Sequence, residues 1–179
     1  GAAHRAHAST VGLAKAVRER GGEAVAGLLM ARELEFLRNA LESPERPFVA
    51  ILGGAKISGK IDVVEALLPR VDRLLIGGAM ANTFFRAMEL ATGDSLIEED
   101  RIDMAAELLE SADDKLILPI DCVVVREVSP DAPTRVVARA DVGDTDRIVD
   151  VGPETRALYR GIVSRARTIV WNGPMGVFE

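Results

Sequence analysis

The pattern of hydrophobic and polar positions changes along the chain near residue 47. Before that point, apolar residues recur three and four positions apart, which predicts an amphipathic helix at 28–41. A shorter helix is predicted ahead of it, with Ser9 or Thr10 as its N-terminal cap and a glycine pair at its end. The segment "ESPERP" after the second helix combines prolines with charge, so we expect a domain boundary there.

After residue 47, short apolar runs alternate with helical segments. Strands are predicted at 48–54, 73–78, 115–125 and 168–173, with a shorter one at 135–139. Helices are predicted at about 57–68, 80–88, 95–112 and 153–166. The apolar runs contain few alternating polar residues, so both faces of most strands should be covered by helices. This pattern predicts an α/β fold with a doubly wound, mainly parallel, Rossmann-like sheet and helices on both faces.

Two local expectations accompany these elements. Ser95 and Glu98 have the spacing of a capping box at the start of the helix at 95–112. Glu98, Glu99 and Asp100 then fall in its first turn, where the helix dipole favours negative charge, and we expect them to be solvated. Trp171, at the end of the last strand, is expected in the core.

Composition and charge exclude several classes of function. The chain has 179 residues and is 48% hydrophobic, which is enough for a substantial core. Its net charge of −6, without a basic block, disfavours nucleic-acid and membrane partners. Cys122 is the only cysteine, which excludes an internal disulfide. With no apolar run near the roughly 20 residues that cross a bilayer, we expect a cytoplasmic protein, and the chain ends suggest a piece of a longer one.

The residues that directly follow the apolar runs have similar compositions. The four segments are "GGAK", "GGAMAN", "PID" and "NGPMG". In an open parallel sheet the ligand crevice lies beyond the carboxyl ends of the strands, and glycines there let backbone amides approach a ligand. A single glycine pair is explained by a tight turn. Three glycine-rich turns at one edge instead predict a backbone-lined nucleotide or phosphate site.

Two lysines follow the first glycine pair. Lys56 and Lys60 lie four apart at the start of a predicted helix, so both ammonium groups could face one anion, although exposed surface lysines are the competing interpretation. The stretch from Gly54 to Lys60 also matches most of a GxxxxGK[ST] phosphate loop. Ile61, however, stands where that loop needs a magnesium-binding hydroxyl. A P-loop nucleoside triphosphatase therefore remains only an alternative.

Other polar residues have less specific surroundings. His4 and His7 lie three apart but lack nearby carboxylates or cysteines, so we expect no metal site there. Arg5 between them is a candidate anion-binding group, because its guanidinium matches carboxylate and phosphate. Asp121 follows an apolar strand and could cap or orient a loop.

Six motifs, in this order and spacing, resemble phosphoglycerate kinase: "AHRAH", "ILGGAKISGK", "IGGAMANTF", "LPID", "DVGPET" and "WNGPMGVFE". The resemblance covers the whole chain. It implies a two-lobed, monomeric enzyme of glycolysis that transfers a phosphoryl group between 1,3-bisphosphoglycerate and ADP, giving 3-phosphoglycerate and ATP with Mg²⁺. Residues 1–44 would be the end of the N-terminal, phosphoglycerate-binding lobe with the interlobe helix, and residues 45–179 a truncated nucleotide-binding lobe.

The resemblance also implies roles for single residues. Lys56 matches the lysine that neutralises the transferring phosphoryl group, and Lys60 its companion on the nucleotide phosphates. Asn172 matches a contact to those phosphates, Glu179 a carboxylate on the ribose hydroxyls, and Arg5 an arginine on the phosphoglycerate. The adenine and ribose pocket would be lined by Gly53, Gly54, Gly77, Gly78, Leu96, Val149 and Pro174.

The chain departs from the family pattern in three ways. Gly59 stands where many members have Asp, which costs a helix up to about 1 kcal/mol relative to alanine, and Ala79 stands where a third glycine is common. The later glycine-rich loop, which supplies a magnesium-binding aspartate, has no counterpart here. We therefore expect this chain alone to bind nucleotide without completing the reaction. A non-catalytic nucleotide-binding fragment is the second alternative.

Overall fold

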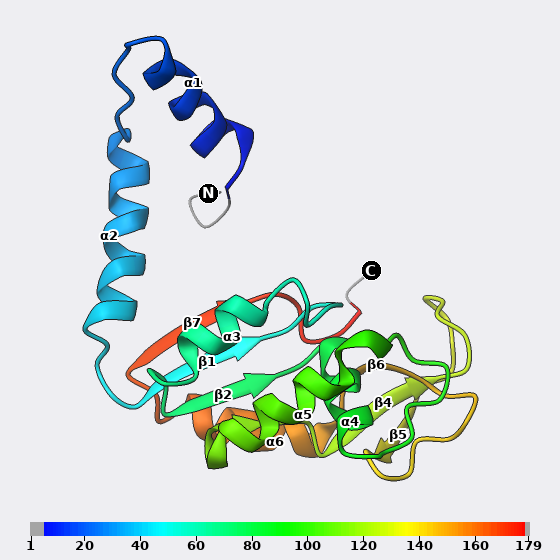
Figure 1. The fold of residues 1–179 in the computed structure, drawn as a ribbon. Helices are drawn as coiled ribbons and strands as arrows, with labels where there is room; N and C mark the ends of the chain where they lie inside the picture. The colour runs from blue at the N-terminus through cyan, green and yellow to red at the C-terminus, as the bar shows by residue number, and fades with distance from the viewer. Residues whose placement is uncertain (1–5, 178–179) are drawn as a thin grey trace. The chain divides into compact units, whose positions relative to one another are not determined.

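The computed structural model describes residues 6–177, apart from the side chain of Leu37, and its contacts divide the chain into two units, 1–44 and 45–179. The first unit contains a π-helical turn, Ala8–Gly12, followed by α1, Leu13–Glu19, and α2, Leu28–Glu42 (Figure 1). The predicted cap was wrong by two or three residues. His7 is the N-cap, and its backbone N–H donates to the Thr10 hydroxyl over 3.1 Å.

The second unit is built on a four-stranded parallel sheet in the order β3-β2-β1-β7. The strands are β1, Phe48–Leu52; β2, Arg73–Ile76; β3, Leu116–Ile117; and β7, Thr168–Asn172. The helices are α3, Ile61–Leu67; α4, Met80–Ala87; α5, Ile102–Ser111; and α6, Pro153–Val163. Figure 1 shows α3 and α6 on opposite sides of the sheet. The predicted doubly wound α/β class is confirmed.

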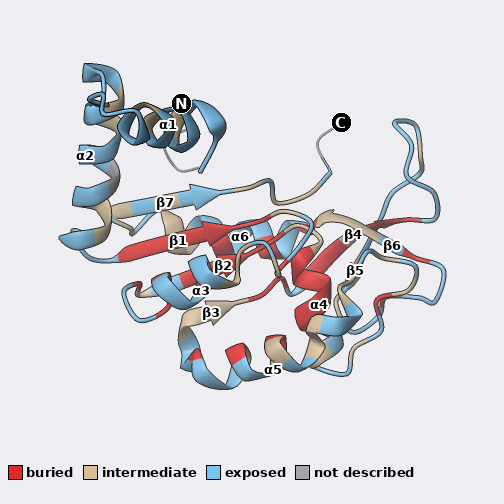
Figure 2. Ribbon diagram, turned by 45° about the horizontal axis from the view of Figure 1, so that its top comes forward, coloured by how far each residue is buried: buried red, intermediate tan, exposed pale blue. Residues whose placement is uncertain are grey.

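Burial of the central strand explains why its sequence is continuously apolar. Every residue of β1 is buried, and β1 lies between β2 and β7 (Figure 2). On one face, Val49 and Ile51 pack with Tyr159 and Ile162 of α6. The Tyr159 hydroxyl donates to the carbonyl of Ile76 over 2.7 Å, and burial raises the pKa of that hydroxyl. Helix α6 is therefore held to the sheet by both apolar packing and a buried hydrogen bond.

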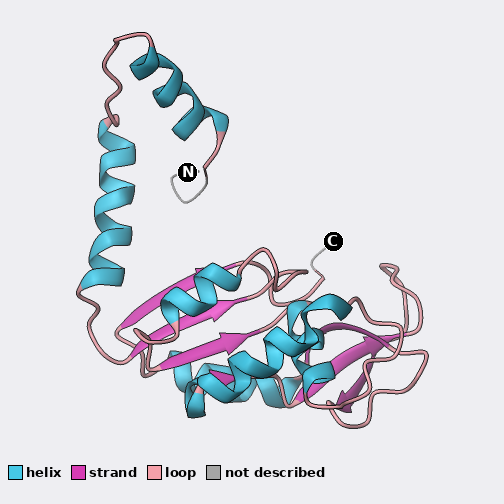
Figure 3. Ribbon diagram, viewed as in Figure 1, coloured by secondary structure: helices cyan, strands magenta, loops and turns pink. Residues whose placement is uncertain are grey.

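A second, antiparallel sheet corrects the prediction of one strand at 115–125. This sheet has the order β5-β4-β6, with β4, Asp121–Val125, between β5, Arg135–Ala138, and β6, Arg147–Val151 (Figure 3). The apolar run is interrupted at Pro119, which has no N–H to donate to a ladder. The chain therefore leaves the parallel sheet after β3 and enters the second sheet as β4.

The predicted helix at 95–112 begins later than its sequence suggested, and its capping box does not form. A 3₁₀ turn at Glu99–Arg101 precedes α5. The Ser95 hydroxyl instead accepts the backbone N–H of Ile148 over 2.9 Å, and the Glu98 carboxylate binds the loop after β1. Ser95 and Glu98 are thus each hydrogen-bonded to residues far away in the sequence, and not to each other as the local pattern predicted.

Trp171 corrects another expectation, because its side chain is 65% exposed instead of lying in the core. It lies on β7, which pairs only with β1 among the described strands and therefore forms an edge of the sheet. None of the described helices is both long enough and apolar enough to span a membrane.

Candidate functional site

The turns that follow β1, β2 and β7 contact one another at the carboxyl edge of the parallel sheet. The N–H of Gly53 donates to the carbonyl of Asn172 over 3.0 Å, and the N–H of Gly78 donates to the carbonyl of Met175 over 2.7 Å. Because all three strands run parallel, their carboxyl ends lie at the same edge. The structure therefore brings the three predicted glycine-rich turns together.

Close contact between these turns requires glycine at positions 53 and 78. A Cβ on Gly53 would lie 2.0 Å from the carbonyl oxygen of Pro174. Gly78 has a φ of +67°, and a Cβ there would lie 2.5 Å from the backbone nitrogen of Gly54. Backbone contacts among the turns alone therefore require these glycines. We call the three packed turns after β1, β2 and β7 the rim.

Lys60 connects two of the turns. Its Nζ donates to the carbonyl of Gly53 and lies 3.3 Å from the carbonyl oxygen of Asn172. Partial burial of the ammonium group lowers its pKa, because desolvation disfavours the charged form. A cationic side chain is thereby placed between the turns after β1 and β7.

The two lysines do not share a helical face, which corrects the prediction. Helix α3 begins at Ile61, so Lys60 is its N-cap residue and Lys56 lies in the irregular loop before it. Lys56 is exposed, and its ammonium group has no hydrogen bond or ion pair with any residue between 6 and 177. The site therefore presents one partly buried and one exposed ammonium group.

Glu98 organises the loop that carries Lys56. Its Oε2 accepts the N–H of Ile57 over 2.5 Å and the N–H of Ser58 over 3.1 Å, while the Ser58 hydroxyl donates to Oε1. Burial raises the pKa of this carboxyl, but these hydrogen bonds and the nearby Lys56 ammonium outweigh burial, and the net shift is downward. No local sequence pattern indicates this contact, because the partners are 40 and 41 residues apart.

A small cavity lies beside the turn after β2. Its volume is about 30 Å³, and its lining includes Gly78, Val149 and Val177 together with the fully buried Asn82. The Asn82 side-chain amide donates to the carbonyl of Leu96 over 3.1 Å, whereas its Oδ1 has no hydrogen-bond partner among the described residues. Val149 is thus brought to the glycine turns, whereas the Leu96 side chain remains 56% exposed.

Asp121 has a structural role. Its carboxylate, which is 4% exposed, accepts the N–H groups of Glu154 over 2.9 Å and Thr155 over 2.7 Å, at the start of α6. A Cβ on Gly152 would lie 2.2 Å from this carboxylate. The "PID" segment therefore holds the helix that supports β1 and β2, consistent with the capping role that its sequence allowed.

Two predicted site residues, Arg5 and Glu179, lie outside the described residues. Gly77 lies against Met175, because a Cβ there would be 2.3 Å from the Met175 methyl carbon. Between residues 6 and 177, no group of three or more His, Cys, Asp or Glu side chains is placed to hold a metal ion.

Comparison with known proteins identifies the family. The family model described as Phosphoglycerate kinase matches residues 1–179. The chain belongs to the phosphoglycerate kinase family. It is 51% identical over 179 residues to the phosphoglycerate kinase of Latilactobacillus sakei, covering 100% of this chain and 44% of the relative. It is 55% identical over 182 residues to that of Chlorobium chlorochromatii, covering 100% and 45%.

Two solved structures of phosphoglycerate kinases have the same fold. The structure from Coxiella burnetii superimposes with a TM-score of 0.82 at 46% identity, covering 86% of this chain and 40% of that one. The structure from Pyrococcus horikoshii gives a TM-score of 0.79 at 31% identity, covering 99% and 45%. The resemblance predicted from six motifs is confirmed. The chain spans less than half the length of the phosphoglycerate kinases that it matches.

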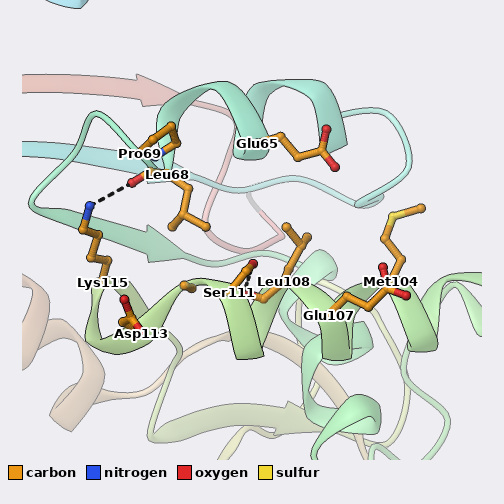
Figure 4. A pocket seen from close by; sticks show the side chains of 10 residues that line it. Glu65, Leu68, Pro69, Met104, Glu107, Leu108, Ser111, Asp113 and Lys115 are labelled. Atoms are coloured by element: carbon orange, nitrogen blue, oxygen red, sulfur yellow. Dashed lines mark hydrogen bonds between the residues drawn. The ribbon is translucent and has the colours of Figure 1, made fainter.

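A groove beside helix α3 lies away from these turns. Figure 4 shows it between α3 and α5, with Leu68 and Leu108 among its apolar side chains and Lys115 donating to the carbonyl of Leu68 over 3.3 Å. Its volume is about 430 Å³. None of the predicted site residues lines it, so this groove is separate from the candidate site.

Proposed function

We propose that this chain is the nucleotide-binding part of an enzyme that transfers a phosphoryl group between 1,3-bisphosphoglycerate and ADP, producing 3-phosphoglycerate and ATP. The supporting observation is the union of three glycine-rich turns at one sheet edge, with Lys60 bridging two of them. In this proposal residues 45–179 belong to the nucleotide lobe. Residues 1–44 end the phosphoglycerate-binding lobe and form the interlobe helix.

Lys60 is assigned to the nucleotide phosphates. Its ammonium group is now bonded to neutral carbonyl oxygens, and a polyphosphate would offer charged acceptors in their place. The negative charge of a phosphate attracts the ammonium group more strongly than the dipole of a neutral carbonyl does. We also assign Asn172, whose turn Lys60 already contacts, to the phosphates. Binding therefore exchanges internal lysine contacts for contacts with the ligand.

The base and ribose are assigned to the side of the rim near Val149. The cavity there, at about 30 Å³, is too small for a purine. Binding of the base therefore requires part of the cavity lining, such as residues 175–177, to move. The unpaired Oδ1 of Asn82 at this cavity would accept an N–H from a ligand or a water molecule. Pro174 and the glycines of the three turns complete the proposed wall.

Phosphoryl transfer in this enzyme needs charge stabilisation more than proton transfer. In the direction of acyl phosphate formation, the attacking group is a carboxylate of 3-phosphoglycerate, which is already ionised and needs no base. Positive groups facing the equatorial oxygens of the transferring phosphoryl group would stabilise the transition state. Lys56, which is exposed and makes no hydrogen bond or close ion pair with residues 6–177, is assigned to this role.

The remaining partners follow from the same proposal. Arg5 is assigned to the phosphoglycerate and Glu179 to the ribose hydroxyls. The described residues offer no carboxylate cluster for Mg²⁺, so we assign no metal ligand among them and expect a magnesium-binding aspartate elsewhere in the protein. We also expect a cytoplasmic monomer with no nucleic-acid or membrane partner.

The P-loop alternative is disfavoured by one contact. In a phosphate loop, backbone N–H groups surround the phosphates. The N–H groups of Ile57 and Ser58, within the GxxxxGK match, are instead occupied by the Glu98 carboxylate. Ile61 also offers no hydroxyl for magnesium. A non-catalytic nucleotide-binding fragment remains an outcome that an activity assay of the complete protein decides.

The test uses Lys56→Ala in the complete protein, with Lys115→Ala, a lysine outside the candidate site, as the control. Calorimetry measures ADP affinity, and a coupled assay with 3-phosphoglycerate measures turnover. Loss of one preorganised donor should lower turnover about a hundredfold, with ADP affinity nearly unchanged, because Lys56 is assigned only to the transferring group. The control should keep the ADP affinity and the turnover of the wild-type protein. Equal small changes in turnover and affinity would contradict the assignment.

A further inference from the structure

The loop that carries Lys56 has little regular structure of its own. It connects β1 to α3, which begins at Ile61, and residues 58–60 form a turn. A Cβ on Gly59 would have no atom within 4 Å, so this part of the loop is loosely packed. The Ile57 side chain is fully buried, but it fixes only one point of the loop. The position of the Lys56 ammonium group therefore depends on contacts made by the neighbouring backbone.

Glu98 makes those contacts from a distant part of the sequence. Its carboxylate accepts two consecutive backbone N–H groups, of Ile57 and Ser58, and the Ser58 hydroxyl. Its own backbone N–H donates to the hydroxyl of Thr83 over 3.2 Å, and Thr83 is buried in α4. Glu98 thus joins the loop after β1 to a helix of the protein core.

The chemistry of this contact favours a fixed loop. A carboxylate accepts hydrogen bonds from consecutive amides more strongly than a neutral oxygen does. The same bonds outweigh the effect of burial and lower the pKa of Glu98, so it is ionised at neutral pH. The contact also occupies both amides, which leaves the side chain of Lys56 as the group in this loop that faces solvent with a positive charge.

We propose that Glu98 is a positioning residue that holds the loop at 56–58 and thereby places the Lys56 ammonium group for phosphoryl transfer. This inference rests on the proposed function. Glu98 touches neither substrate nor nucleotide in it and acts through the two amides beside Lys56. Its loss should therefore lower turnover without a matching loss of nucleotide affinity, because Lys60 and the glycine turns keep their own contacts.

The test is Glu98→Gln in the complete protein, with Glu99→Gln as the matched control. Glutamine keeps the shape of the side chain, but its neutral amide oxygen accepts the N–H groups of Ile57 and Ser58 more weakly than the carboxylate does, and the Ser58 hydroxyl has to turn to accept from the NH₂ group. Glu99 is exposed, and its substitution makes the same change of charge one position away. Ser58→Ala is a third variant, which removes the hydroxyl and keeps both backbone contacts.

Two measurements separate positioning from general stability. Hydrogen exchange read by NMR reports on the Ile57 and Ser58 amides, and we expect it to become about tenfold faster in Glu98→Gln as their bonds weaken. Turnover should fall about tenfold to a hundredfold, the effect of a displaced catalytic group, while the KM for ADP changes less than about twofold. Glu99→Gln should change neither, and Ser58→Ala should have a smaller effect than Glu98→Gln.

Each contrary outcome overturns a defined part of the inference. Unchanged exchange at both amides in Glu98→Gln would show that the carboxylate does not hold the loop. Faster exchange with equal losses in turnover and ADP affinity would show a structural contact with no specific effect on Lys56. A wild-type protein that binds ADP without turnover would overturn the proposed function, and the exchange measurement would still decide whether Glu98 holds the loop.

Discussion

Gly78→Ala tests whether the three glycine-rich turns depend on direct backbone contact. Gly78 has a φ of +67°, where a residue with a Cβ is disfavoured by about 1–2 kcal/mol. The added Cβ would lie 2.5 and 2.7 Å from the nitrogen and oxygen of Gly54 and 2.9 Å from the oxygen of Pro174. These are all backbone atoms, so no flexible side chain can move aside.

Relief of this clash must separate the turns. The 2.7 Å bond from Gly78 to Met175 and the 2.9 Å bond from Met80 to Gly54 join them, and each lost bond costs about 1 kcal/mol. With the backbone strain, we expect Gly78→Ala to lower the free energy of unfolding by about 3 kcal/mol. The separated rim should also bind ADP more weakly, because Lys60 would lose its fixed neighbours.

Gly161→Ala is the control for this experiment. Gly161 lies inside α6, and a Cβ there would have no atom within 4 Å. Alanine should therefore stabilise the helix by up to about 1 kcal/mol. Urea unfolding measures both variants, and calorimetry measures ADP binding. If Gly78→Ala were as stable as Gly161→Ala and bound ADP normally, the turns would not need the contact described here.

Two further predictions concern Asp121 and Cys122. Burial raises the pKa of the Asp121 carboxyl, but the hydrogen bonds from Thr155 and Glu154 outweigh it and the net shift is downward. The stabilisation that the ionised Asp121 carboxylate gives to the folded state is therefore complete above the unfolded-state pKa of about 3.9. It is lost as pH falls through the lower folded-state pKa. Urea unfolding should show Asp121→Asn to be less stable by about 2 kcal/mol at pH 7, and a difference that does not shrink in acid would refute this. Burial also raises the pKa of the Cys122 thiol to about 12, so an aromatic disulfide reagent at pH 8 should leave the folded protein unmodified and react only after unfolding; rapid reaction of the native thiol would contradict its burial.

Glu98 and Trp171 show where local sequence rules failed. The spacing of Ser95 and Glu98 fits a capping box, but Glu98 binds amides 40 and 41 residues away. Trp171 lies in an apolar run, but the run forms β7, which is an edge among the described strands, and so its side chain is 65% exposed. A local pattern shows the spacing of hydrophobic residues, which distinguishes a helix from a strand. It contains no information about which distant group will compete for a side chain.

The sequence by itself determined the alternation of strands and helices, the class of the sheet and the family. These depend on hydrophobic period and on short motifs, both of which are local properties. Tertiary structure alone decided that α3 begins after Lys60, that the apolar run at 115–125 divides at Pro119 between two sheets, and that Glu98 holds the loop beside Lys56. The physical reason is competition: a buried amide or carboxylate takes the strongest partner that the fold brings near it, whatever the distance between them in the chain.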